Sequence, residues 1–206
     1  MQSFWQALQT QRWDDHRYYH HSLVNQSLHL FSAVSFVIAY LLMYNDPWLA
    51  ALIGWLVSMT SRQIGHFFFE PRDYDVVNQA TDEYKEAIKV GYNIRRKIVL
   101  MTVWALSPLL LLVEPTMFGF VDAPVTWMDF ARHLGYVWFA VGIGGLLFRG
   151  LQLFLTQDYL TSLAWMTKII TDPFHDIKLY YLAPIHLLKG DLMDGEPEDE
   201  PAESFL

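Results

Sequence analysis

The sequence has no cysteine among its 206 residues. This absence excludes disulfide bonds, thiol catalysis and zinc sites built from thiolates, so a bound metal would need nitrogen and oxygen ligands. The long apolar segments carry no acidic residue near their middle, which argues against a transporter. The formal net charge is −8 and the basic residues flank the apolar segments. Nothing in this pattern favours nucleic-acid binding.

Hydrophobic residues make up 53% of the chain and occur in blocks. Four of these blocks approach the roughly 20 residues that a helix needs to cross a bilayer. We therefore predict an all-α integral membrane bundle of about four transmembrane helices, forming one domain over residues 1–190. The expected spans are residues 22–44, 47–69, 95–113 and 133–155.

Interfacial helices are expected at both ends of this bundle. One is predicted over residues 3–12, and residues 157–190 are predicted to form an amphipathic segment that is broken at Pro173 and Pro184. The last 16 residues contain seven Asp and Glu, so residues 191–206 are predicted to be a disordered acidic tail. Lys and Arg gather on one side of the predicted spans, which predicts that both termini are cytoplasmic, in a bacterial inner membrane or the endoplasmic reticulum.

Residues 16–29 contain four of the eight histidines and lead directly into the first apolar block. The topology drawn from Lys and Arg places seven histidines at one end of the bundle, with only His133 at the other. Neutral imidazole is the commonest metal ligand in proteins, and sites made of histidine and carboxylate suit iron, zinc or copper. The histidine-rich end is therefore the candidate functional site.

Residue spacing indicates which side chains can meet there. Asn25 and His29 are four residues apart and share a helix face, as do His66 and Glu70. A hairpin of the first two helices brings the second pair beside residues 20–29.

His20 precedes His29 by nine residues, so the two would lie on opposite faces of a continuous helix. They can share a metal only if the helix begins near Ser22 and the preceding turn folds back. His175, in the C-terminal segment, is a further candidate metal ligand.

Two motifs together resemble a known family. The spacing H-x4-N-x3-H at residues 20–29, followed by I-G-H-x-x-F-E at residues 64–70, is similar to that of the small membrane-embedded 2-hydroxy fatty acid dioxygenases. The similarity extends over about residues 16–72. It implies a multi-span membrane enzyme that holds Fe(II) through histidines and uses molecular oxygen to shorten a 2-hydroxy fatty acid by one carbon, in α-oxidation.

The resemblance implies three Fe(II) ligands, His20, His29 and His66, and two supporting catalytic residues, Asn25 and Glu70. Basic residues near the same end, Arg62 and Arg72 among them, are candidates for binding the substrate carboxylate. The expected partners are a fatty acyl or other lipid substrate, molecular oxygen and membrane lipids.

Two alternatives stay open. The first is a di-iron membrane fatty acid hydroxylase or desaturase, prompted by the H-x3-H-H run at residues 16–21. Such enzymes carry several histidine boxes, whereas this chain has one. The second is a non-catalytic membrane protein, either a scaffold or a haem protein in which His29 and His66 face each other across two helices.

Overall fold

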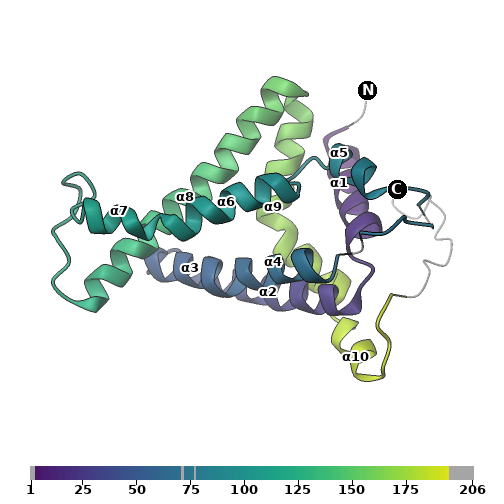
Figure 1. The fold of residues 1–206 in the computed structure, drawn as a ribbon, viewed down its shortest axis with the longest axis horizontal. Coiled ribbons are helices and arrows are strands. Elements are labelled where there is room, and N and C mark those ends of the chain that lie inside the picture. The colour runs from purple at the N-terminus through teal and green to yellow at the C-terminus, as the bar shows by residue number, and fades with distance from the viewer. Residues whose placement is uncertain (1–2, 71, 77, 195–206) are drawn as a thin grey trace.

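The structure is a computed structural model that describes residues 3–70, 72–76 and 78–194. Within these residues the chain is all-helical and contains no strand, as the sequence predicts (Figure 1). The helices are α1 (Phe4–Tyr19), α2 (Leu23–Leu42), α3 (Pro47–Ile53), η1 (Gly54–Met59), α4 (Thr60–Phe68), α5 (Asp82–Ile88), α6 (Ile94–Leu106), α7 (Pro108–Val113), α8 (Trp127–Thr156), α9 (Tyr159–Tyr180) and α10 (Ala183–Leu188).

The hairpin that positions the site consists of α2 and the helical rod α3–η1–α4. The Ser22 hydroxyl caps α2 by accepting from the backbone N–H of Asn25. Pro47 opens α3 at a first-turn position, where its missing N–H costs nothing. The rod includes a π-helical turn, η1, and the Ser32 hydroxyl of α2 donates to the carbonyl oxygen of Ser58 in that turn at 2.7 Å.

Three helical segments are long and apolar enough to cross a membrane, namely Leu23–Leu42, Ile94–Val113 and Trp127–Thr156. They match three of the four predicted spans. The rod predicted as residues 47–69 is helical to Phe68, but its second half carries Arg62, Gln63 and His66, and it is not among the three. A fourth span at residues 47–69 and the cytoplasmic location of both termini remain predictions.

Several predicted boundaries were wrong. The first helix does not end at residue 12 but continues to Tyr19. The last apolar helix, α8, begins at Trp127 because Thr126 and Asp129 form a capping box there. Pro173 does not break α9, which runs through it to Tyr180. A proline removes only one helical hydrogen bond, and packing along the rest of α9 offsets that loss.

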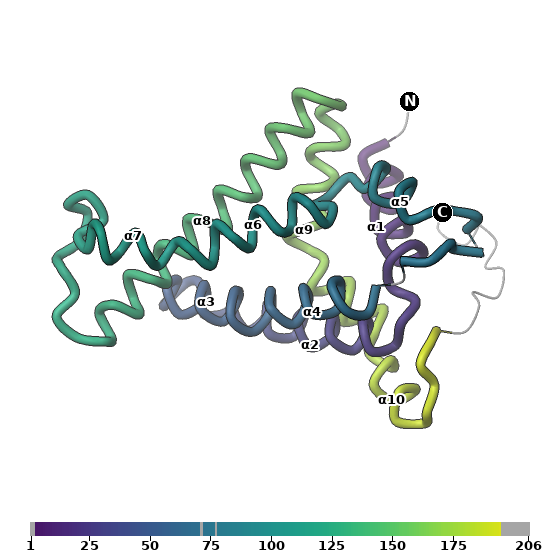
Figure 2. The backbone as a smooth tube through the Cα atoms, in the orientation of Figure 1, coloured from purple at the N-terminus to yellow at the C-terminus, as the bar shows by residue number. Residues whose placement is uncertain are grey.

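The helix packing gathers the site at one end of the molecule (Figure 2). Helix α9 crosses the hairpin and packs against α1, α2 and α8, while α8 also packs on α3. At the far end Trp55, Trp138 and Leu111 belong to a buried apolar cluster. Part of the predicted acidic tail, residues 191–194, lies beside the start of α2, where the Leu23 N–H donates to the Leu192 carbonyl oxygen at 3.0 Å. The rest of the tail, residues 195–206, lies outside the described part of the chain.

Candidate metal centre

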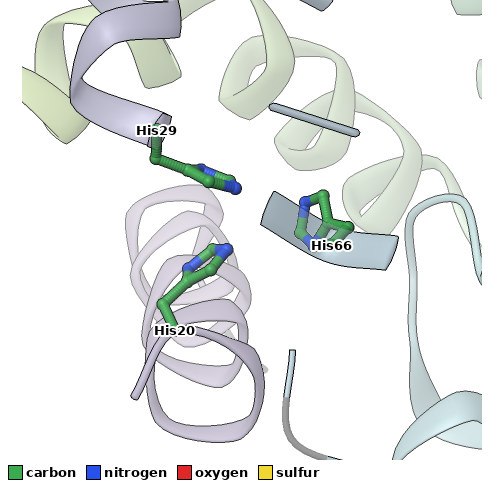
Figure 3. Close-up of side chains that lie close together, drawn as sticks. All are labelled: His20, His29 and His66. Carbon is green, nitrogen blue, oxygen red and sulfur yellow. The ribbon is translucent and has the colours of Figure 1, made fainter. Parts of the chain in front are cut away.

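Three histidines, one at the end of α1 and two in the hairpin, lie close together (Figure 3). His20 caps the C-terminus of α1, His29 lies on the second turn of α2, and His66 lies near the end of α4. One nitrogen of each ring lies within 4.8 Å of the others. Ring centroids are 4.2 Å apart for His20 and His29, and 4.8 Å apart for His29 and His66. The chain reaches this arrangement because α1 ends at His20 and Ser22 starts α2, as the spacing requires.

Two of the three histidines, His20 and His29, are buried and have nitrogen atoms without partners. His29 is 1% exposed and His20 is 6% exposed. Nε2 of His20 and both ring nitrogens of His29 have no hydrogen-bond partner. Each such buried polar atom costs about 1–3 kcal/mol when left unsatisfied. Each of the three rings offers one nitrogen to a shared ion without further rearrangement, so His20, His29 and His66 form a candidate metal site.

Groups behind the rings fix their orientation. His66 Nδ1 lies 3.0 Å from Glu70 Oε2, and because a carboxylate only accepts, Nδ1 carries the proton and Nε2 keeps a free lone pair. His20 Nδ1 is hydrogen-bonded to the Tyr180 hydroxyl at 3.0 Å. Asp176 Oδ2 lies 3.7 Å from His29 Nδ1. A carboxylate or hydroxyl bonded to His66 and His20 in this way is the arrangement that orients metal-binding histidines.

The protonation state of His20 also suits a ligand. Burial, reinforced by the neighbouring His29, holds the pKa of His20 well below its usual value. The imidazole is thus neutral at physiological pH, which is the form that binds metal. Two metal–nitrogen bonds of about 2.1 Å span at most about 4 Å, and the ring nitrogens lie within 4.8 Å of one another. The donor set, all nitrogen, fits iron or zinc.

The three histidines open onto a cavity of about 660 Å³. Its histidine end is polar and includes Arg62, Lys97 and Asp176, whereas its other end is apolar and runs between α2, η1, α6 and α8 to Trp55 and Trp138. A volume of this size is typical of a small-molecule site. A ligand with a polar head and an apolar tail would match both ends.

The other predicted site residues take different places. Asn25 is fully buried and donates to the Tyr19 carbonyl oxygen at 2.9 Å, while its Oδ1 has no partner. Glu70 contacts His66, one of the three candidate ligands. Arg62 lines the cavity and pairs with Asp176.

Two predicted residues lie outside the histidine group. His175 lines the cavity but does not belong to the group of three. Arg72 is exposed, does not line the cavity and donates to the Phe67 carbonyl oxygen at 2.9 Å. Its position follows from α4 ending at Phe68, after which the chain turns away.

Sequence reasoning missed three residues of this site: Asp176, Tyr180 and Lys97. Asp172, Asp176 and Tyr180 recur every four residues on α9, a spacing that places them on one face and could have revealed a polar stripe. Lys97 gave no such signal because it ends a basic run at the start of a predicted span, where basic residues are common.

Comparison with protein-family models, with curated proteins and with solved structures finds no match to this chain.

Proposed function

We propose that this protein is an Fe(II)-dependent membrane dioxygenase that acts on a 2-hydroxy fatty acid. The observation that carries the proposal is the group of three histidines, each with a ring nitrogen within 4.8 Å of the others, at the polar end of an amphipathic cavity. The three apolar helices support a membrane location. The motif resemblance at residues 20–29 and 64–70 supports the choice of metal and substrate.

In this proposal His20, His29 and His66 hold the metal, and Glu70 and Tyr180 keep two of the rings oriented. A metal held by these three residues would keep coordination positions open and would supply the oxygen chemistry of the reaction. The apolar arm of the cavity excludes water and holds the hydrocarbon chain. Overall, one 2-hydroxy acid and one oxygen molecule give the acid that is one carbon shorter, one carbon dioxide and one water.

The geometry favours this proposal over the two alternatives. His29 and His66 already stand edge to face, with ring centroids 4.8 Å apart, which leaves no room for a porphyrin between them. A di-iron centre needs a second group of ligands, and the described residues contain one such group.

The proposal is tested by metal analysis of protein purified anaerobically in detergent. We expect about one iron per chain in the wild type and in His186→Ala, a control because His186 is 46% exposed in its side chain. We expect the metal to be lost in His20→Ala, His29→Ala and His66→Ala. Iron-loaded protein should then convert a 2-hydroxy fatty acid to the shorter acid in the presence of oxygen. A wild-type protein that holds no metal after ferrous reconstitution contradicts the proposal.

A further inference from the structure

Lys97 is a buried lysine at the polar end of the cavity. It lies in the first turn of α6, is 8% exposed and lines the cavity. Its Nζ lies 3.9 Å from Glu70 Oε2, the same oxygen that His66 Nδ1 contacts at 3.0 Å. Lys97 therefore stands next to the histidine group.

No described acceptor satisfies Lys97. Glu70 is its nearest carboxylate, but the separation of 3.9 Å is beyond hydrogen-bonding distance. Both oxygens of Glu70 also have closer partners, since Oε1 accepts from Lys89 at 3.0 Å and Oε2 pairs with His66. The N–H groups of Lys97 are thus left for something inside the cavity.

The other cations that line the cavity differ in this respect. Arg12, Arg62, Lys89 and Lys168 each have a carboxylate within 3.5 Å. Among the described lining residues, Lys97 alone lacks such a partner. Burying a cation without a partner is costly, and an anionic group of a ligand would remove that cost.

The wall beyond Lys97 is apolar. Leu100 and Met101 follow on the same face of α6 and also line the cavity. Across from them, Phe139 and Ile143 of α8 continue the lining. A ligand with its anionic head at Lys97 would place a hydrocarbon chain along this wall.

We infer that Lys97 binds the carboxylate of a single-chain fatty acid and selects acids over neutral lipids of equal chain length. The identification of that acid as the enzyme's substrate rests on the proposed function. The binding of a carboxylate beside an apolar wall does not, because it follows from Lys97 and the cavity alone.

The test measures binding to the full-length protein in lipid nanodiscs, as purified and again after removal of metal by a chelator. Tetradecanoic acid and tetradecanol compete with a fluorescent fatty acid. We expect the wild type to bind the acid about 10-fold or more tightly than the alcohol, as a charge-assisted contact predicts. Lys97→Met should lose this preference while binding the alcohol as before. Lys97→Arg should keep most of it.

The matched control is Arg95→Met, which removes an exposed cation two residues away on the same helix and should leave the preference unchanged. A wild type that binds acid and alcohol equally, or a Lys97→Met variant that still prefers the acid, overturns the inference. If Lys97→Met does not fold, Lys97→Gln takes its place and should lose the preference, because it also removes the charge. Because the acid is not hydroxylated and the metal is removed, the result is independent of whether the protein is a dioxygenase.

Discussion

At the scale of single residues, the histidines of the candidate centre depend on side chains that would not touch a metal. Glu70 accepts from His66 and from Lys89, each at 3.0 Å. The Tyr180 hydroxyl lies between His20 Nδ1 at 3.0 Å and His16 Nδ1 at 3.3 Å. These contacts fix ring orientation, and orientation determines how well three nitrogens share one ion.

Glu70→Gln should weaken metal binding. The amide keeps the shape of the side chain but removes the charge that orients His66, and loss of such a partner typically costs about 10–100-fold in metal affinity. The affinity can be measured by titration against a competing chelator. Glu83→Gln, which changes an exposed acidic residue on α5, is the control. Equal affinities for Glu70→Gln and the wild type would show that Glu70 does not position a ligand.

At the scale of helices, the close approach of α4 to α2 depends on Gly65. A Cβ at this position would lie 2.1 Å from Asn25 Oδ1 and 3.5 Å from His29 Cδ2. Only glycine allows the two helices to come this close, and the contact lies directly beside His66. The distance between two of the three candidate ligands is therefore set by a residue without a side chain.

Gly65→Ala should push α4 away from α2. We expect a loss of about 1–3 kcal/mol of stability, as for other overpacked sites, together with weaker metal binding. Thermal unfolding and metal analysis measure the two effects. Gly144→Ala is the control because a Cβ there meets nothing within 4 Å. If Gly65→Ala unfolds and binds metal as the wild type does, the contact between the helices is looser than described.

Two glycines of α8, Gly142 and Gly144, allow a matched test of the apolar arm of the cavity. Gly142 lines the cavity, and a Cβ there would lie 3.7 Å from Trp55 Nε1. Gly142→Leu should fill the end of the arm and lower affinity for long-chain acids more than for short-chain acids, measured by competition binding over a series of chain lengths. Gly144→Leu, on the same helix but outside the cavity, should leave the series unchanged. An unchanged series for Gly142→Leu would place the hydrocarbon chain elsewhere.

At the scale of the whole molecule, an ion-pair network joins the N-terminal helix to α9. Lys168 of α9 donates to Asp15 of α1 and to Asp172 at 3.0 Å. Although burial alone would raise the pKa of Asp15, the Lys168 and Lys89 ammonium groups lower it from 3.8 to about 2. A group with a depressed pKa stabilises the fold above its unfolded pKa, and this contribution is lost as the pH falls through the folded value.

Asp15→Asn should therefore destabilise the protein most at neutral pH. The difference in melting temperature between wild type and variant should shrink as the pH falls from about 4 towards about 2, where Asp15 becomes protonated. Asp14→Asn removes a partly exposed pair with Arg17 and should have a small effect at every pH, since such pairs contribute about 0–1 kcal/mol. A difference for Asp15→Asn that does not vary with pH would rule out this ion pair as its source.

The site was predictable from the sequence only where local patterns determine which residues meet. His29 and His66 follow from the period of two apolar helices joined by a short turn, and His20 follows from the cap at Ser22. Lys97 and Tyr180 belong to helices whose packing on the hairpin no local pattern determines. The same limit applies to the fold: the helical character was predictable, whereas the course of α9 through Pro173 depends on tertiary packing.

The position of the three histidines has a further consequence for a chain without cysteine. An ion held by His20, His29 and His66 would act as a crosslink, joining the end of α1 to both helical arms of the hairpin. Like a disulfide, a crosslink of this kind restricts the unfolded chain by closing loops, and longer loops are restricted more. The loop between His29 and His66 contains the whole α2–α3 turn. The metal would then contribute to folding as well as to chemistry, fastening together segments that no covalent bond connects.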